Sequence, residues 1–589
     1  MRLATFVWQK NEHLGLVLPH PHMGEDWVFA PALVQERLEL YASRGTSPYH
    51  VTKPRFFPGT APDDMVELLA LGDMGMSGLR RMHDFLLRFI EQSDAYILQA
   101  AGAPLSQVQL RAPVPRPRLF FGLVQNSPTV WRHVPERHHL NLFPQGHQRP
   151  QGAVLGAGDP IILPQADVLL GGWNPELGVI IGRGGRDIPV GAAMAHVAGL
   201  TVVSDVTFDY FRRIMFDQPE PYDWFEDAMS SWGDKKSDAR TPMGPFLVTL
   251  DEIGNPYDLL IYTRQNGFLR DRSHTGAMHL GIERTVSWLS SVMTLYPGDV
   301  IHMGTMGYDG SPTIDAWAPG AGDVIESEIE RVGVLRNPFV VMAAEDEWRS
   351  SHTEGRVHPA PVARELIDVD RLALADPSAW QPELARHFWM VFKNTQSDAD
   401  GLPARPYPRF LNAPARALAA SGSAVEIPAR AANLSVSCEL ACVIGRLARG
   451  VTAEEAADYI AGYAAMIGLH DSSFADAILE PATPQERHLP EVYTRWADGF
   501  NVIGALARFD DPLTHEFSLS ISEVGSMQGS TAEYRLDAAQ IMAFISQYIT
   551  LFPGDVVTLG ATSQQLTLPA DNADGIAIHA EIDGLPAVE

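Results

Sequence analysis

The sequence predicts a mixed, β-rich α+β protein made of two long homologous units in tandem. The chain has 589 residues, several times the usual size of one domain. Its composition, with 46% hydrophobic and 20% charged residues, is ordinary for a globular protein. The segment Glu-Leu-Gly-Val-Ile-Ile-Gly-Arg at Glu176 recurs as Glu-Leu-Ala-Cys-Val-Ile-Gly-Arg at Glu439, an offset of 439 minus 176, or 263 residues. In both copies β-branched residues follow the glutamate and a Gly-Arg pair ends the run, which is typical of a strand that ends in a turn.

Three further segment pairs occur in the same order along the chain, with offsets between 256 and 268 residues. They are 120–126 with 388–394, 204–208 with 470–474, and 296–300 with 552–556. A drift of this size is what insertions and deletions in loops produce. The pattern therefore indicates two long repeated units and not a solenoid of short repeats.

The repeat divides the chain into four expected parts. These are an N-terminal subdomain at 1–115 with a helical stretch around 79–98, a first and candidate catalytic unit at 116–345, a connector or remnant subdomain at 346–385 that is rich in charge, Pro and Ala, and a second, degenerate unit at 386–589. In the second unit Thr452 and Glu455 have the spacing of a capping box, so a helix is expected to begin there.

Charge and cysteine content exclude several classes of function. The chain has 44 basic and 72 acidic residues, a net charge of -28, which disfavours nucleic acid and anionic membranes as partners. The N-terminus lacks the apolar run of a signal peptide and no segment approaches about 18 consecutive apolar residues, so a cytoplasmic protein is expected. The only cysteines, Cys438 and Cys442, would lie roughly 13 Å apart on a strand, too far apart to form a disulfide.

A group of oxygen-bearing side chains lies where strands are expected in the first unit. Asn174 and Glu176 are two residues apart and therefore point to one face of a strand, and Asp205 lies on a strand that follows the next helix. Mg²⁺ prefers such carboxylate and amide oxygens. Acidic side chains at strand ends are more often solvated surface groups, so this spacing by itself is a weak indication of a metal site.

Several motifs of the first unit, taken together, resemble the fumarylacetoacetate hydrolase family. The motifs are Gly-Asp-Pro-Ile-Ile-Leu-Pro at 158–164, the Glu176 strand, 196–207 with its Ser-Asp-Val-Thr ending, Pro-Met-Gly-Pro at 242–245, and Pro-Gly-Asp-Val at 297–300 followed by Gly-Thr at 304–305. The two-unit arrangement is also similar to the isomerase/decarboxylase of homoprotocatechuate breakdown. The resemblance implies that each unit is a β-sandwich roll.

The resemblance implies a divalent ion, Mg²⁺ or else Mn²⁺ or Ca²⁺, bound to a 2-oxo acid or β-dicarbonyl substrate. Glu176 and Asp205 match two of the family's metal-ligand positions. The family's other glutamate is replaced here by Asn174, which keeps an oxygen but loses a negative charge and should weaken cation binding. Asn126 matches a further ligand position, so the expected metal site consists of two carboxylates and two amides.

The same resemblance assigns catalytic and substrate-binding residues. Lys235 would stabilise a developing enolate or oxyanion, and Thr305 would contact the substrate. His133 and Glu136 have the His-x-x-Glu spacing that the family uses to activate water, a general base worth about 10² to 10⁴ in rate. Lys235, which lies beside Lys236, can equally be an ordinary solvated lysine. His133 can likewise be an ordinary loop histidine.

The second unit departs further from the family pattern. Alignment of the two copies places Ser437, Glu439, Asp471 and Arg495 where the first unit has Asn174, Glu176, Asp205 and Lys235. This unit is therefore expected to be mainly structural and to pack against the first unit as an intramolecular pseudo-dimer, with further homo-oligomerisation left open.

The leading function from sequence is a metal-dependent C–C bond hydrolase acting on an acylpyruvate-like substrate through a metal-bound enolate. Decarboxylation and keto-enol isomerisation are alternatives because they use the same enolate. Because the ligand glutamate is replaced in both units, a metal-free cyclase or isomerase and a non-catalytic scaffold also stay open.

Overall fold

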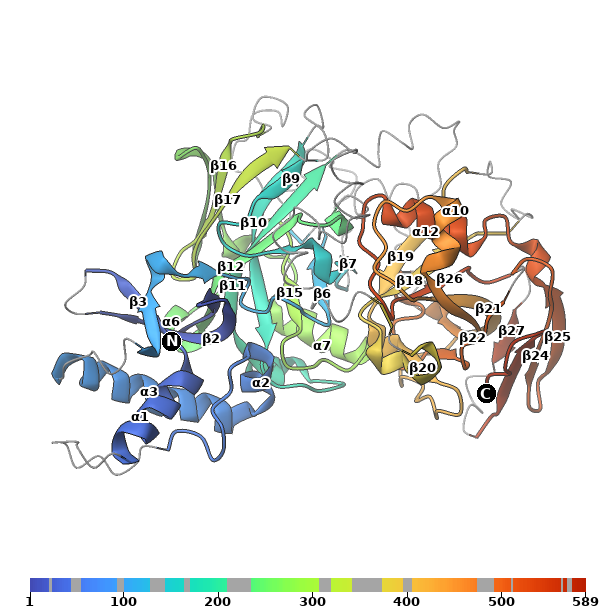
Figure 1. The fold of residues 1–589 in the computed structure, drawn as a ribbon, viewed down its shortest axis with the longest axis horizontal. Coiled ribbons are helices and arrows are strands. Elements are labelled where there is room, and N and C mark those ends of the chain that lie inside the picture. The colour runs from blue at the N-terminus through green and yellow to red at the C-terminus, as the bar shows by residue number, and fades with distance from the viewer. Residues whose placement is uncertain are drawn as a thin grey trace.

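The structure is a computed structural model, and its two halves lie side by side (Figure 1). It describes residues 1–20, 24–43, 55–92, 100–124, 126–127, 143–163, 170–208, 235–306, 319–341, 373–374, 376–395, 405–473, 492–509, 512–562, 565–568 and 575–589. The expected connector at 346–385 falls largely outside these residues. Within the described part of the chain, no helix is long and apolar enough to cross a membrane.

A twelve-stranded sheet forms the frame of the N-terminal half. Its order is β4-β3-β2-β1-β12-β11-β10-β15-β6-β7, with β5 paired to β1 and β8 to β12. The strands are β1 (Arg2–Trp8), β2 (Asn11–Pro19), β3 (Asp26–Phe29), β4 (Gly102–Pro104), β5 (Gln109–Leu110), β6 (Phe120–Leu123), β7 (Gly146–Gln148), β8 (Val154–Leu155), β10 (Leu170–Ile181), β11 (Val197–Phe208), β12 (Thr241–Thr249) and β15 (Val300–His302). Because β1 pairs with β12, the strands of residues 1–115 extend the sheet of the first unit.

A five-stranded sheet, β14-β13-β16-β17-β9, packs against this frame. Its strands are β9 (Ile161–Leu163), β13 (Leu260–Gln265), β14 (Phe268–His274), β16 (Val324–Ile329) and β17 (Gly333–Val341). Exposure alternates residue by residue along β13 and β16, as expected for strands with one buried face. The hydroxyl of Ser327 on β16 donates to the hydroxyl of Ser204 on β11 at 3.1 Å, so the two sheets meet next to the strand that carries Asp205.

Helices cover the outer strands and close the first unit. They are α1 (Pro31–Ser43), α2 (Met65–Ala70), α3 (Gly72–Gln92), α6 (Leu250–Ile253) and α7 (Ile282–Val292). The helix expected around 79–98 is α3, which begins earlier than the sequence indicated. Leu68 of α2 and Leu86 of α3 are fully buried in one core with Leu16 of β2 and Leu247 of β12, so this core joins the N-terminal helices to the first unit.

The second half repeats the arrangement. An eight-stranded sheet, β19-β18-β26-β21-β22-β23-β20 with β27 paired to β21, accompanies a three-stranded sheet, β25-β24-β28. The strands are β18 (Phe388–Phe392), β19 (Arg409–Ala413), β20 (Leu418–Ala420), β21 (Leu434–Ile444), β22 (Ile460–Asp471), β23 (Asn501–Ile503), β24 (Glu516–Ile521), β25 (Gly525–Ser530), β26 (Val556–Thr558), β27 (Leu566–Leu568) and β28 (Ile578–Ile582). The order β7-β6-β15-β10-β11 recurs as β19-β18-β26-β21-β22, which confirms two tandem units of one β-rich fold.

Two helices of the second unit begin with reciprocal caps. Helix α10 (Ala453–Ala456) has the capping box predicted from Thr452 and Glu455, since each side chain bonds the other residue's backbone N–H. Helix α12 (Ala538–Ser546) has a box of the same kind at its start.

The two units contact each other reciprocally. Asp238 of the first unit accepts hydrogen bonds from the backbone N–H and hydroxyl of Thr550, at 3.1 and 2.5 Å. Asp498 of the second unit accepts the same two bonds from Thr294, the backbone one at 3.0 Å. When one patch of each unit contacts the matching patch of the other, the interface has the pattern of a two-fold dimer. Aromatic rings fill its centre, where Phe121 meets Trp496 edge to face at 6.0 Å.

Candidate active site of the first unit

The site is built on the antiparallel pair β10 and β11. Asn174 lies directly opposite Asp205 in this pair, and Glu176 lies two residues further along β10, on the same face as Asn174. Glu176 and Asp205 are buried, whereas Asn174 is half-buried. Local strand geometry and register therefore bring together the three residues that the sequence analysis singled out.

Two cations neutralise Asp205. The guanidinium of Arg149 donates to one carboxylate oxygen and the ammonium of Lys235 donates to the other. Arg149 also donates to the hydroxyl of Thr241 at 2.5 Å and is completely buried. Burial by itself would raise the pKa of Asp205, but Arg149 and Lys235 outweigh it and hold the pKa well below the usual 3.8. Asp205 therefore stays ionised throughout the neutral range.

Glu176 is bound by three donors. The Nδ1 of His302 donates to one oxygen, which also accepts from the backbone N–H of Gly304 at 3.1 Å. The hydroxyl of Thr305 donates to the other oxygen at 3.1 Å. Burial lowers the pKa of His302 from its usual 6.5, although Glu176 opposes this effect. A neutral imidazole with its proton on Nδ1 fits this arrangement, and it leaves Nε2 without a proton.

The Nε2 of His302 faces the backbone of β6. A methyl group added at Gly122 would lie 2.1 Å from this atom, far inside van der Waals contact. We expect Gly122→Ala to displace His302 and to lower the free energy of unfolding by about 1 to 3 kcal/mol. Urea denaturation measures the loss, and Gly191→Ala, which meets no atom within 4 Å, is the matched control. Equal stability of the two variants would contradict this packing.

Asn126, a metal ligand in the sequence analysis, makes hydrogen bonds to the backbone in the structure. Its amide oxygen accepts from the N–H of Leu280 at 2.7 Å, and its amide nitrogen donates to the carbonyls of Leu280 and Met303 at 3.0 and 2.8 Å. Asn394 of the second unit makes the equivalent bonds to Leu536 and Leu559. The fold explains the backbone contacts of this asparagine in both units, and its assignment as a metal ligand stays a prediction.

The side chains of the site differ in how far they are exposed to solvent. The Lys235 side chain is 13% exposed and that of Asp205 is 8% exposed, while Arg149, Glu176 and His302 are at most 1% exposed. Thr305 and Asn174, like Lys235, are half-buried residues. Lys235 and Thr305 are therefore among the more exposed residues of the described site, whereas the Arg149 side chain is enclosed. His133 and Glu136 lie outside the described residues, and their assignment stays a prediction.

The described donors do not fit a divalent ion. Glu176 and Asp205 carry two negative charges, and Arg149 and Lys235 carry two positive ones, so the cluster is neutral as it stands. A divalent ion would add two positive charges beside the buried Arg149 and the half-buried Lys235, which is electrostatically unfavourable. Among the described residues, no three His, Cys, Asp or Glu side chains are grouped so that they could hold a metal ion.

Arg149 and His302 are the two site residues that sequence reasoning missed. His302 stands two residues before the Gly304-Thr305 motif, and Arg149 directly follows β7. Only the position of His302 next to a known motif offered a signal. The contact between Arg149 and Asp205 joins residues 56 positions apart and could not be found from local spacing.

Strand register in the second unit corrects one assignment. Ser437 pairs with Gly468, as Asn174 pairs with Asp205, so Gly468 and not Asp471 occupies the position of Asp205. A methyl group at Gly468 would lie 2.6 Å from the guanidinium of Arg495 and 2.9 Å from a Glu439 oxygen. Arg495 therefore takes up the space that the carboxylate has in the first unit.

Arg495 closes the second site completely. Its guanidinium donates to Glu439 at 2.7 Å and to Asn501 at 2.7 Å, and all three residues are buried. Burial alone would raise the pKa of Glu439, but Arg495 lowers it to about 2. Among the described residues, the second cluster is thus a buried ion pair between Arg495 and Glu439.

Comparison with known proteins agrees with the repeat. The family model described as fumarylacetoacetate (FAA) hydrolase C-terminal matches residues 120–340 and again 388–589. "Oxaloacetate tautomerase FAHD2B, mitochondrial" of Bos taurus is 33% identical over 321 residues, which cover 53% of this chain and 90% of that protein. "2,4-didehydro-3-deoxy-L-rhamnonate hydrolase" of Sphingomonas sp. (strain SKA58) is 31% identical over 208 residues, or 35% of this chain and 66% of that protein.

The solved structures that resemble this chain include a hydrolase and an isomerase. Maleylpyruvate hydrolase from Sphingobium sp. SYK-6, determined with manganese (II) ion and pyruvate, is 24% identical, covers 58% of this chain and 100% of its own, and superposes with a TM-score of 0.39. A 5-carboxymethyl-2-hydroxymuconate delta-isomerase from Mycobacterium smegmatis is 22% identical over the same shares, with a TM-score of 0.38.

Proposed function

The chain belongs to the fumarylacetoacetate hydrolase family of enzymes, and from that premise we propose that its first unit interconverts the keto and enol forms of a small 2-oxo acid without a bound divalent ion. The observation that carries the proposal is the neutral cluster in which Arg149 and Lys235 balance Asp205 and Glu176. Its accessible member is an ammonium, the group needed to stabilise an enolate.

In the proposed reaction a base takes the proton from the carbon beside the substrate carbonyl, the electron pair of that C–H bond forms the C=C bond of the enolate, and the carbonyl π pair moves onto the oxygen. Lys235 donates a hydrogen bond to this oxygen as negative charge develops, and a proton then returns to it to give the enol. Asp205 holds the ammonium in place, and Arg149 keeps Asp205 ionised. These contacts exist before the substrate arrives, so little reorganisation is needed during the reaction.

Thr305 is proposed to orient the substrate. Its hydroxyl hydrogen is directed at Glu176, which leaves the oxygen lone pairs free to accept a hydrogen bond from an enol hydroxyl. Glu176 is itself fixed by His302 and the N–H of Gly304. We therefore regard Glu176 and His302 as positioning residues. The base that removes the C–H proton is proposed to be His133 with Glu136, as the family resemblance implies.

The sequence analysis ranked C–C bond hydrolysis first, and hydrolysis is now the second candidate. It is favoured by the 31% identical rhamnonate-pathway relative, which is named a hydrolase. Hydrolysis needs a delivered water and a site for a second oxyanion in addition to the enolate, whereas tautomerisation needs only proton transfer and enolate stabilisation. The described residues provide for the enolate, and several relatives are named oxaloacetate tautomerases.

The second unit is proposed to act as a built-in partner subunit. Its site is closed by the Arg495–Glu439 ion pair, while its interface carries the reciprocal contacts of Asp238 and Asp498. Linking the two units in one chain makes their association independent of protein concentration.

Enol absorbance with oxaloacetate as substrate tests the proposal directly. We expect the purified protein to accelerate approach to keto-enol equilibrium, to keep its kcat in excess EDTA, and to contain far less than one metal ion per chain by mass spectrometry, because the cluster is already neutral. Loss of activity on chelation with recovery on adding Mn²⁺ would contradict the metal-free site. Absence of turnover with oxaloacetate, and likewise with acylpyruvates, would contradict the function itself.

A further inference from the structure

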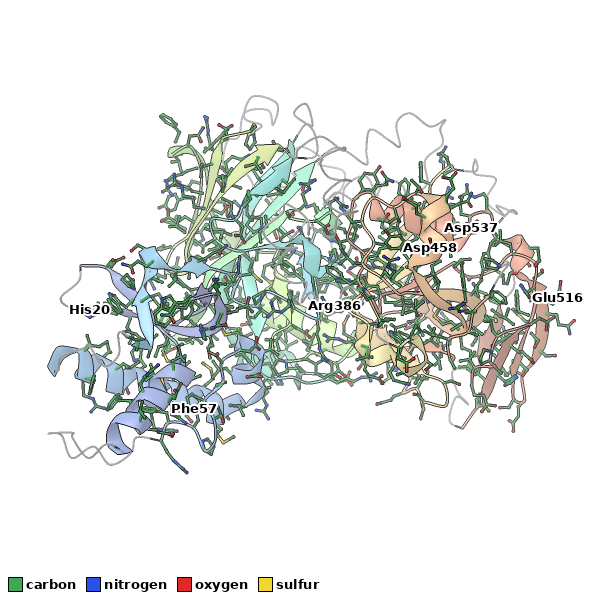
Figure 2. The ribbon with its side chains drawn as sticks, viewed as in Figure 1. His20, Phe57, Arg386, Asp458, Glu516 and Asp537 are labelled. Carbon is green, nitrogen blue, oxygen red and sulfur yellow. The ribbon has the colours of Figure 1, made fainter. Side chains whose placement is uncertain are left out.

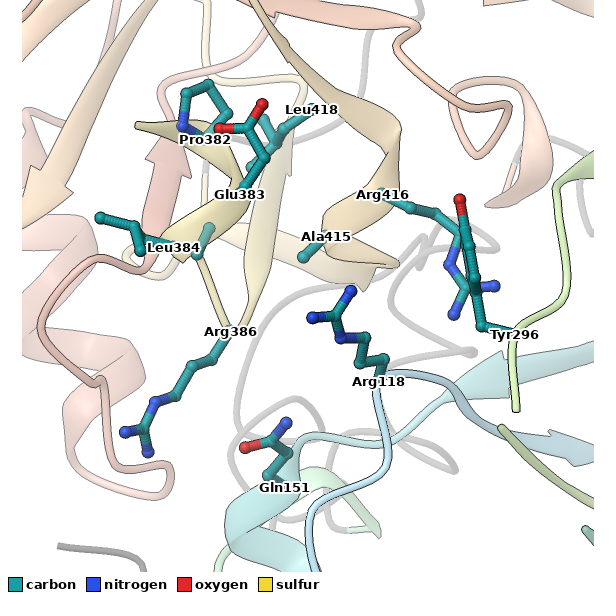
Figure 3. A pocket seen from close by; sticks show the side chains of 11 residues that line it. Arg118, Gln151, Tyr296, Pro382, Glu383, Leu384, Arg386, Ala415, Arg416 and Leu418 are labelled. Atoms are coloured by element: carbon teal, nitrogen blue, oxygen red, sulfur yellow. The ribbon is translucent and has the colours of Figure 1, made fainter. Parts of the chain in front are cut away.

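A cavity of about 430 Å³ lies between the two units, apart from the site described above (Figure 3). The first unit contributes Arg118, Gln151 and Tyr296, the end of the expected connector contributes 382–385, and the second unit contributes 386, 415, 416 and 418. Figure 2 places Arg386 near the middle of the molecule, where the two units meet. The volume is within the range of sites for small molecules.

Two of the cavity's arginines are equivalent in the two units. Arg118 stands two residues before β6 and Arg386 two residues before β18, and these strands have the same place in the two sheets. Phe120 pairs with Val300 and Phe388 with Val556, so the local register is the same too. The cavity therefore lies where the pseudo-two-fold relation brings the same basic position from both units together.

The cavity wall is positively charged in a strongly acidic protein. Arg118, Arg386 and Arg416 line the cavity with one carboxylate, that of Glu383, and Asp299 pairs with Arg416 from outside the lining, so the net charge of these groups is +1 while the whole chain has -28. In Figure 3 the Arg118 guanidinium points toward Ala415 and Arg416, and the Glu383 carboxylate lies on the far side of the cavity. Opposite charge of this kind attracts and orients anions.

The three arginines of the cavity differ in the contacts that their side chains already make. Arg416 forms a bidentate pair with Asp299, at 2.7 Å for each bond, and stacks over Tyr296 at 4.7 Å. Arg386 stacks over Phe552 at 5.1 Å. Arg118 has no hydrogen-bond or ion-pair partner among the described residues. The cavity thus has two guanidinium groups in fixed positions and a third that is available for a ligand.

We propose that this cavity binds a small multivalent oxyanion, a polyphosphate or a polycarboxylate, with Arg118 as the principal ligand-binding residue. Planar guanidinium groups form paired hydrogen bonds with phosphate and carboxylate oxygens, and an anion with several charged groups can contact arginines of both units at once. Such a ligand binds only when the two units are docked, so its binding stabilises their association.

Calorimetric titration of the full-length protein with pyrophosphate and, separately, citrate tests this proposal at constant ionic strength. We expect one anion per chain, an affinity about tenfold weaker for Arg118→Ala, and no change for Arg336→Ala. Arg336 is an exposed arginine of the first unit that does not line the cavity, so the two variants have the same net charge. Tighter binding of pyrophosphate would identify a polyphosphate ligand, and tighter binding of citrate a polycarboxylate.

Thermal unfolding gives an independent readout. The preferred anion should raise the midpoint of the wild-type protein and of Arg336→Ala, and raise it less for Arg118→Ala, whereas the midpoints without anion should agree because Arg118 is exposed. Absence of binding by both anions, or equal binding by the two variants, would overturn the proposal. Neither outcome depends on the tautomerase activity.

Discussion

Replacing Lys235 by alanine is expected to lower kcat for keto-enol conversion by roughly 10² to 10³-fold, the usual effect of removing one oxyanion-stabilising donor. Lys235 is the more exposed of the two cations bound to Asp205, and Arg149 is completely buried. The fold should persist, because Arg149 still neutralises Asp205 in the variant. Steady-state kinetics with oxaloacetate measure the effect, with KM changing much less than kcat.

Two further variants control this experiment. Lys10→Ala removes an exposed lysine far from the site in the chain and should leave kcat unchanged. Lys235→Arg keeps a positive charge and should recover part of the rate, because a guanidinium can also donate to an enolate oxygen. A Lys235→Ala protein with wild-type kcat would show that the enolate is stabilised elsewhere.

Replacing Asp205 by alanine is expected to lower the free energy of unfolding by about 3 to 5 kcal/mol and to abolish activity. The variant leaves the fully buried Arg149 and the half-buried Lys235 without their common counter-ion. Arg149→Met in the same chain should restore much of the stability, since an apolar side chain of similar length has no charge to compensate. Urea denaturation measures both changes, and Asp583→Ala, at an exposed aspartate, is the control.

The pH dependence of this difference follows from the depressed pKa of Asp205. A carboxylate whose pKa is lower in the folded than in the unfolded chain stabilises the fold above the unfolded value, here 3.8. The difference between wild type and Asp205→Ala should therefore be constant near neutrality and shrink only as the pH falls below 3.8 toward the folded pKa. A difference that disappears near neutral pH would contradict the ion-pair cluster.

Together the two variants distinguish effects on turnover from effects on the stability of the fold. Lys235→Ala should affect turnover with little effect on stability, and Asp205→Ala should affect both. Adding Arg149→Met to Asp205→Ala should recover stability without recovering activity, because the ammonium of Lys235 is still unanchored. A metal-dependent site would respond differently, since loss of Asp205 would then also remove a measurable ion.

The sequence by itself indicated the repeat, the strand character of both units and five residues of the candidate first site, which are Asn174, Glu176, Asp205, Lys235 and Thr305. Alternation along a strand and the spacing of turns are local properties, so the Glu176 strand and the cap at Thr452 followed from nearest neighbours. Lys235 and Asp205 entered through motifs whose residues are close in the chain. The structure confirms the fold and places these side chains in contact.

Tertiary structure decided which charges meet. Arg149 reaches Asp205, and His302 reaches Glu176, across 56 and 126 residues of chain, and a pairing at such distances leaves no periodic trace in the sequence. Strand register placed Gly468 and not Asp471 at the second site, a choice that depends on backbone hydrogen bonds between strands. Whether a carboxylate is available to a metal or is already neutralised depends on the groups that folding brings beside it, and only the folded chain shows that.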